Sequence, residues 1–130
     1  MYYETLHGTH YFVYEDCSCG DLRSWLARKD NCKLRFDEIQ PIISDVVEGL
    51  KALYKVDVIH RDLLPNNIWI TNKGRAKLSG LDLAERENPH KKNAMLRPFK
   101  HNGYNPPDDL EGAPNSGARH DMWNLGVIMY

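Results

Sequence analysis

The sequence contains few cysteines and no long apolar stretch. Its three cysteines are Cys17, Cys19 and Cys32, and an odd, low number is typical of reduced thiols rather than of a disulfide framework. No apolar stretch approaches the roughly 18 residues that a membrane-spanning helix requires, and the first residues lack the pattern of a signal peptide. We therefore expect a cytoplasmic protein with no membrane partner.

The sequence also lacks an excess of either charge. It has 17 Lys and Arg residues and 18 Asp and Glu residues, which leaves a formal net charge of −1. Nucleic-acid binding usually needs a strongly basic surface, so this balance argues against nucleic acid as a partner. A length of 130 residues fits one domain or part of one.

The first elements are short. Residues 11–14 form a β-prone run, and residues 15–20 have the composition of an extended linker. Asp21 can cap a short helix over residues 22–28, because a carboxylate accepts hydrogen bonds from the first free N–H groups of a helix.

A longer amphipathic helix is predicted next. Apolar residues recur at steps of three and four through residues 39–54, which indicates one face turned toward a core. Asp37 and Gln40 have the spacing of a capping box at its start, although Pro41 also suits a start one turn later. Gly49 lowers helix propensity, so we expect a close approach of backbone to a neighbour there.

A hairpin and a third helix are predicted in the remainder. Residues 68–71 and 76–78 read as strands that flank the turn Asn-Lys-Gly at residues 72–74. Residues 85–115 have little apolar periodicity and read as a loop, and the chain turns helical again from Asp121.

Between the long helix and the hairpin lies a polar segment, HRDLLPNN, at residues 60–67. Asp62 supplies a carboxylate and Asn67 an amide oxygen, separated by one tight loop. Phosphoryl transfer uses such a pair, one group to orient and deprotonate a hydroxyl and the other to bind Mg²⁺. The letters match the kinase catalytic loop H-R-D-L-x-x-x-N at every fixed position. The chain therefore resembles a eukaryotic protein kinase.

The resemblance implies a fold and a division of the chain. The implied fold is α+β and mainly helical, a partial protein-kinase-like fold with short hairpins, truncated at both ends. Residues 1–16 would be the end of the small lobe and the hinge, and residues 17–130 an incomplete large lobe. In a complete relative, Asp62 would orient the protein hydroxyl that receives phosphate and Asn67 would bind Mg²⁺.

The resemblance also places the nucleotide. Backbone groups of Glu15 and Cys17 would face the adenine of ATP, and Asp21 would face the ribose, with a plain helix cap as the alternative for Asp21. Trp69 would lie under the adenine ring and fill the floor of the pocket. Alternatively, Trp69 packs the hairpin onto the core.

Several residues depart from the family pattern. In kinases the hairpin leads to D-F-G, but Gly80 stands in the place of the Asp and Asp82 in the place of the Gly. One Mg²⁺ ligand is therefore missing, unless a register shift brings in Asp82. Leu64 replaces a Lys and His101 a Thr of serine/threonine kinases, while Pro65 argues against the tyrosine-kinase form. The acceptor class stays open, with the serine/threonine type favoured.

The segment that usually controls a kinase also departs. Residues 83–109 contain no Ser or Thr, and Tyr104 is the only hydroxyl there. By resemblance, Arg61 pairs with a phosphorylated residue of this segment, so switching is tyrosine-based or absent. Pro-Pro-Asp at residues 106–108 matches A-P-E loosely. Asp121 begins a D-x-W block whose carboxylate would support the catalytic loop through backbone hydrogen bonds.

One expectation and three alternatives follow from these residues. No G-x-G-x-x-G loop and no V-A-I-K strand precede Tyr11, so we expect a kinase-like domain with impaired transfer of phosphate from ATP to protein hydroxyls. The first alternative is an active kinase whose other lobe is encoded upstream. The second is a pseudokinase-type module that binds a protein partner without catalysis, and the third is a fragment too incomplete to fold. The partner is a protein in each functional case, and the oligomeric state stays open.

Overall fold

The computed structural model describes residues 2–29, 34–86, 104, 106–107 and 117–130. Three features of the sequence lie outside these residues, namely Cys32, His101 and Asp108, together with most of the predicted loop at residues 85–115. In chain order, the elements are β1 (Tyr2–Leu6), β2 (Thr9–Val13), α1 (Leu22–Ala27), α2 (Phe36–Tyr54), β3 (Val58–Ile59), η2 (Pro65–Asn67), β4 (Ile68–Ile70), β5 (Ala76–Leu78), η3 (Leu81–Leu83), β6 (Glu85–Arg86) and α4 (Ala118–Met129), where η marks a 3₁₀ helix.

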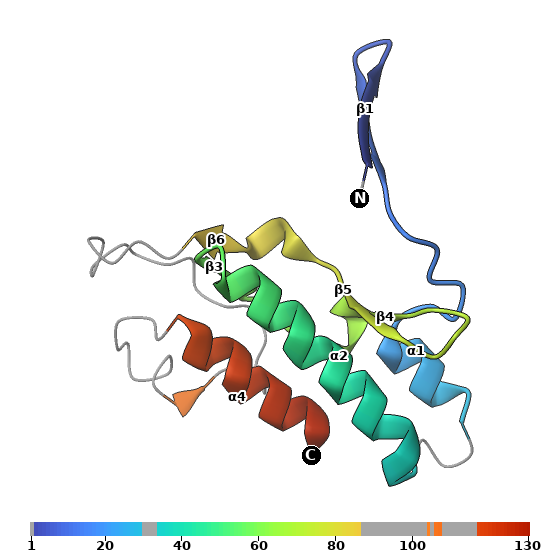
Figure 1. Cartoon of the computed structure of the whole chain (residues 1–130), viewed down its shortest axis with the longest axis vertical. Coiled ribbons are helices and arrows are strands. Elements are labelled where there is room, and N and C mark those ends of the chain that lie inside the picture. The colour runs from blue at the N-terminus through green and yellow to red at the C-terminus, as the bar shows by residue number, and fades with distance from the viewer. Residues whose placement is uncertain (1, 30–33, 87–103, 105, 108–116) are drawn as a thin grey trace.

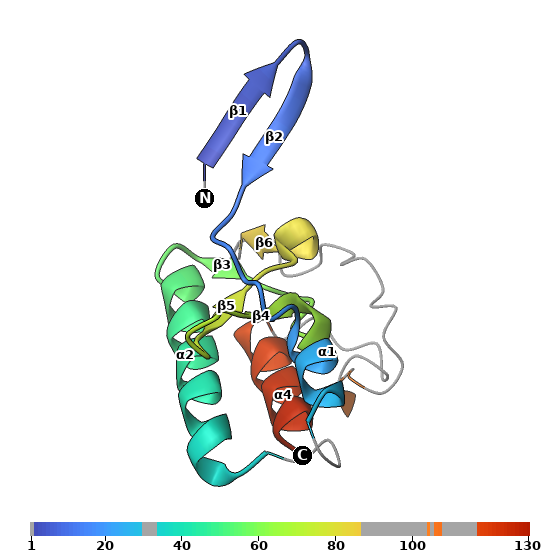
Figure 2. The same ribbon diagram turned by 90° about the vertical axis from the view of Figure 1, so that its right-hand side faces the viewer.

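Helices dominate the body of the molecule. Figures 1 and 2 show α2 and α4 side by side, with α1 and the β4–β5 hairpin packed near them. Within the described residues, the strands form three two-stranded antiparallel sheets, β1–β2, β3–β6 and β4–β5. The expected fold class, mainly helical α+β with short hairpins, is confirmed. Within the described part of the chain, no helix is both long and apolar enough to cross a membrane.

The β1–β2 hairpin stands apart from this body (Figure 2). The sequence predicted only its second strand, at residues 11–14, whereas β2 is Thr9–Val13 and β1 precedes it. His7 and Gly8 join the strands, and both have positive φ values, 49° and 77°, as a two-residue type I′ turn requires. We missed β1 because every residue of β2 is exposed. The pairing therefore leaves no buried and exposed alternation in the sequence.

The start of α2 differs from the prediction. Arg35 is the N-cap, and its N–H donates to the Glu38 carboxylate at 3.1 Å, which is the reciprocal half of a capping box. The predicted pair of Asp37 and Gln40 is therefore wrong. Pro41 lies inside the helix and not at its first position. An arginine side chain has no hydrogen-bond acceptor with which to cap a helix, so the sequence does not mark Arg35 as the start of α2.

The core forms where α2 meets the β4–β5 hairpin. Ile42 and Val46 of α2 and Ile70 of β4 are at most 1% exposed and belong to one apolar cluster. A β-carbon on Gly49 would lie 2.7 Å from Leu78 Cδ1, closer than carbon atoms approach. The expected close approach at Gly49 is confirmed, and it lets β5 lie directly against the helix.

The predicted β4–β5 hairpin is confirmed, although β4 ends one residue before Thr71. Ile68 pairs with Leu78 and Ile70 with Ala76. The Thr71 N–H donates to the Arg75 carbonyl at 2.9 Å, which closes a three-residue turn. Gly74 has a φ of 71°, and this left-handed conformation is the one that such a turn requires.

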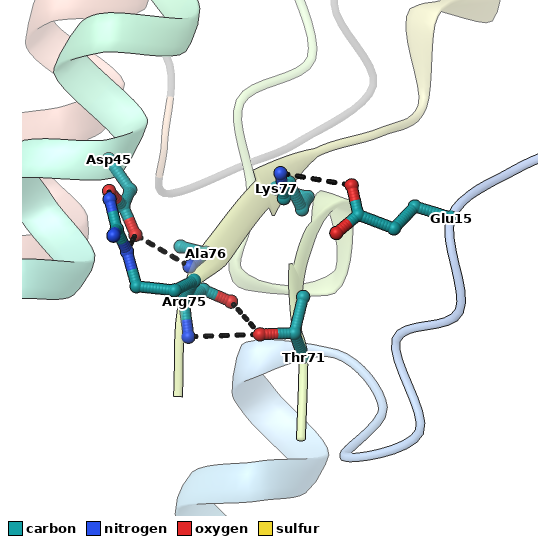
Figure 3. Close-up of polar contacts among 6 residues, drawn as sticks. All are labelled: Glu15, Asp45, Thr71, Arg75, Ala76 and Lys77. Carbon is teal, nitrogen blue, oxygen red and sulfur yellow. Dashed lines mark hydrogen bonds and ion pairs between the residues drawn. The ribbon is translucent and has the colours of Figure 1, made fainter. Parts of the chain in front are cut away.

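The hairpin is attached to α2 by Asp45. The carboxylate of Asp45 accepts from Arg75 Nε at 2.7 Å and from the Ala76 N–H at 2.9 Å (Figure 3). The Asp45 side chain is only 11% exposed. The hydrogen bond from the Arg75 guanidinium holds the pKa of Asp45 below its ordinary value, because it favours the ionised form.

Replacing Asp45 by Asn tests this attachment through pH. A lowered folded-state pKa gives stability above the unfolded pKa of about 4, and that stability is lost as pH falls through the folded-state value. We expect Asp45→Asn to lower the free energy of unfolding at pH 7 by about 1–3 kcal/mol. The deficit should shrink below about pH 4, as measured by urea denaturation across pH. Asp37→Asn, at a carboxylate 69% exposed, is the control. A deficit that does not change with pH would contradict the attachment.

Candidate active site

The segment at residues 60–67 is held in place by one carboxylate from α4. Asp121 is completely buried, and it accepts from the His60 N–H at 2.9 Å and the Arg61 N–H at 2.8 Å. The Tyr54 hydroxyl donates to Asp121 at 3.0 Å. Burial and the neighbouring Asp121 charge raise the pKa of Tyr54, so the phenol stays a donor. The expected backbone support by Asp121 is confirmed, although α4 begins three residues before it, at Ala118.

His60 links the same segment to the end of β5. Its side chain is completely buried, with Nε2 2.8 Å from the Ser79 carbonyl oxygen and Nδ1 3.3 Å from the Asp62 nitrogen. A neutral imidazole with its proton on Nε2 satisfies both contacts, since Nε2–H donates and Nδ1 accepts. His60 therefore fixes the distance between the polar segment and residue 79.

Asp62 and Asn67 lie together, as the sequence predicted. The Asn67 amide Nδ2 donates to both the Asp62 carbonyl and the Asp62 carboxylate, each at 2.7 Å. The main-chain carbonyl of Asn67 accepts a hydrogen bond from the Ser79 N–H at 2.8 Å. The amide is thus used to hold Asp62, and its oxygen Oδ1 is directed toward Gly80.

Gly80 completes the site without contributing a side chain. It adopts a left-handed conformation, with φ 71° and ψ 40°, and begins η3. A β-carbon at Gly80 would lie 2.4 Å from both Cγ and Oδ1 of Asn67. The Asn67 side chain therefore fills the space into which a carboxylate from position 80 would project.

The suggested register shift is wrong. The bonds of residue 79 to His60 and Asn67 fix the chain immediately before Gly80. Gly80 therefore faces Asn67, while Asp82 lies in η3 and is exposed. A local sequence pattern could not decide this, because the register depends on contacts with the loop around residue 60.

The residues at this site supply only part of a magnesium coordination shell. Mg²⁺ prefers oxygen ligands in a strict octahedral arrangement and is usually held by one or two carboxylates together with water and substrate phosphates. Asp62 and the Asn67 amide oxygen are the oxygen groups here, and Gly80 provides none. No group of three or more His, Cys, Asp or Glu side chains suited to a metal occurs among the described residues. The metal role of Asn67 stays a prediction.

The linker before α1 carries two of the predicted nucleotide contacts. The Glu15 carboxylate lies 2.9 Å from Lys77 Nζ on β5 (Figure 3), and the Cys17 carbonyl accepts from the Gly20 N–H at 2.9 Å. Burial is the largest of several causes that raise the pKa of the Cys17 thiol. Glu15 also lines a cleft of about 380 Å³ beside the β4–β5 hairpin. Asp62 and Asn67 are not among the residues that line this cleft. The adenine contacts of Glu15 and Cys17 stay predictions.

Asp21 acts as a helix cap. Its two carboxylate oxygens accept from the Ser24 N–H at 2.9 Å and the Ser24 hydroxyl at 2.8 Å. The bond from the Ser24 N–H is the main cause that lowers the pKa of Asp21. The cap interpretation is therefore confirmed, and contact with a ribose stays a prediction.

Trp69 lies on the outer face of the hairpin. It is 41% exposed, whereas its neighbours Ile68 and Ile70 are completely buried. Trp69 pairs with Lys77 across the hairpin and forms an isolated bridge with Asp21. The interpretation that Trp69 packs the hairpin onto the core is therefore wrong. The outer face remains available for the predicted position under an adenine ring.

One site residue was not found from the sequence. Glu85 of β6 forms an ion pair with the guanidinium of Arg61. The pairing of β3 with β6 brings Glu85 there, and strands of two residues leave no periodic signal. The only signal in the sequence is that the charge of Glu85 is opposite to that of Arg61.

Comparisons with known proteins agree with this geometry. The protein kinase domain family matches residues 1–130. The calcium and calcium/calmodulin-dependent serine/threonine-protein kinase of Oryza sativa subsp. japonica is 32% identical, over 98% of this chain and 24% of its own length. Testis-specific serine/threonine-protein kinase 1 of Homo sapiens is 30% identical, over 98% of this chain and 35% of its own length. The chain thus spans between a quarter and about a third of these relatives.

The hydrogen bonds of Asp121 predict that a conservative substitution of this residue destabilises the fold. Asp121→Asn replaces one acceptor oxygen by an NH₂ group that faces a backbone N–H. We expect the free energy of unfolding to fall by about 1–3 kcal/mol, the usual cost of a buried group left without its hydrogen bond. Urea denaturation measures this, with the exposed Asp16→Asn as the control. Equal midpoints for the two variants would show that the carboxylate does not hold the segment.

Proposed function

The chain belongs to the protein kinase family, and we propose that it supports transfer of phosphate from ATP to a protein hydroxyl only weakly. The contact between Gly80 and Asn67 carries this proposal, because an amide fills the space of the missing carboxylate. The named serine/threonine kinases among the relatives favour Ser or Thr as acceptor. We also propose a cytoplasmic location from the low cysteine content.

The residues that remain have defined parts in such a reaction. The Asp62 carboxylate is the group that can accept a proton from the incoming hydroxyl and orient it. The Asn67 amide keeps that carboxylate in place, and His60 keeps it beside β5. Two described residues leave positive charge at the transferring phosphate unsupplied, since Leu64 is apolar and Gly80 has no oxygen to hold a cation. Loss of one such stabilising group typically costs about 10²–10³-fold in rate.

A protein-binding module without catalysis is the second candidate. Large apolar side chains of the β1–β2 hairpin and the residue after it are about half exposed or more, which is typical of surfaces that contact other proteins. They are Leu6 at 50%, Tyr11 at 48%, Phe12 at 56%, Val13 at 52% and Tyr14 at 64%. The hydrogen bonds by which Asp121 holds the segment at residues 60–67 involve groups of the protein alone. A partner-dependent rise in melting temperature without any effect of Mg-ATP would favour this candidate.

Restoring the carboxylate tests the first proposal. Gly80→Asp supplies the missing oxygen atoms, and Asp tolerates the left-handed conformation of Gly80 better than most residues. We expect it to push the Asn67 side chain aside and to raise the affinity for ATP in the presence of Mg²⁺ but not of EDTA. Isothermal titration calorimetry measures the affinity, and radiolabelled ATP with a protein substrate measures transfer.

Gly80→Ala is the matched control, because it adds the same β-carbon without oxygen atoms. If both variants bind Mg-ATP equally, the missing ligand is not what limits the site. Wild-type turnover near 1 s⁻¹ or above, the range of ordinary kinases, would overturn the proposal of weak transfer.

A further inference from the structure

The backbone at Arg61 is in an unfavourable conformation. Its φ is 65°, in the left-handed region that costs a residue with a β-carbon roughly 1–2 kcal/mol. Such a conformation persists only where the surroundings determine it from several sides. The Arg61 N–H is bound by Asp121, which holds the main chain. A second restraint acts on the Arg61 side chain.

The Arg61 guanidinium is buried and faces a carboxylate. The Arg61 side chain is only 8% exposed, and its Nη1 contacts Oε2 of Glu85. A buried cation is stable only when an anion compensates it. Glu85 is 45% exposed, so it is desolvated less than Arg61 and loses less hydration when it forms the pair.

The strand pairing brings Glu85 to this position. Ile59 of β3 lies opposite Glu85 of β6 in the antiparallel register, and Ile59 is two residues before Arg61. The backbone of β6 therefore lies beside β3, which immediately precedes the segment at residues 60–67. The carboxylate of Glu85 reaches Arg61 from the side, while Asp121 reaches it from α4.

We propose that Glu85 is a positioning residue whose carboxylate holds the Arg61 guanidinium and so keeps the segment at residues 60–67 in its strained conformation. The chain thereby supplies from its own sequence the anion that the resemblance led us to expect from a phosphorylated residue. The order of the segment is then constitutive, and phosphorylation is not required to establish it. This inference is independent of whether the site transfers phosphate.

Amide hydrogen exchange tests the proposal. Glu85→Gln keeps the shape of the side chain and removes its charge, so the ion pair between Glu85 and the buried Arg61 is lost. We expect exchange of the Arg61 and Asp62 amides to accelerate by about 3- to 10-fold, as for loss of a partly exposed ion pair or a charged hydrogen bond. Exchange in the middle of α2 should not change. The measurement is two-dimensional NMR or mass spectrometry on the full chain.

Two further variants keep the test decisive. Glu85→Asp retains the charge and should keep exchange within about 3-fold of wild type, because a charged pair persists. Arg86→Gln, on the same strand, controls for a change of charge near β6. Wild-type exchange in Glu85→Gln would overturn the proposal. If Glu85→Gln fails to fold, loss of protection in Glu85→Asp equal to that of a Glu85→Ala variant would overturn it instead.

Discussion

The structure depends on one buried carboxylate, that of Asp121. It joins α4 to the segment that follows β3 by accepting two successive backbone N–H groups. Because Asp121 is completely buried, a hydrogen bond to it is stronger than it would be in water. The Tyr54 hydroxyl adds a contact from α2. The end of α2 and the segment that begins at His60 therefore meet at one side chain of α4, which lies about 60 residues further along the chain.

The other contacts of the site follow from that restraint. With His60 and Arg61 fixed, the His60 ring reaches the Ser79 carbonyl and so sets the end of β5. Gly80 is then placed against Asn67. The chemistry of the site is therefore decided by the side chains that occupy it. A carboxylate and an amide are present, and a second carboxylate is absent at Gly80.

Family membership and chemical capacity are separate questions for this chain. The family match extends over residues 1–130, and the scaffold contacts at Asp121, His60 and Asn67 are all formed. These contacts determine the shape of the segment at residues 60–67. In the function proposed above, the rate would depend on charge placed near the transferring phosphate, and Leu64 and Gly80 are the residues there that depart from the family pattern.

Local patterns in the sequence determined the three helices α1, α2 and α4, the β4–β5 hairpin and the nearness of Asp62 to Asn67. In each case the signal is a property of neighbouring residues, such as apolar spacing in α2 or the glycine of a tight turn. Only the tertiary structure decided which face Trp69 presents, that Asn67 fills the space beside Gly80, and that Glu85 pairs with Arg61. These features rest on contacts between segments distant in the chain. No local pattern encodes such contacts, because burial and register are set only when the segments pack together.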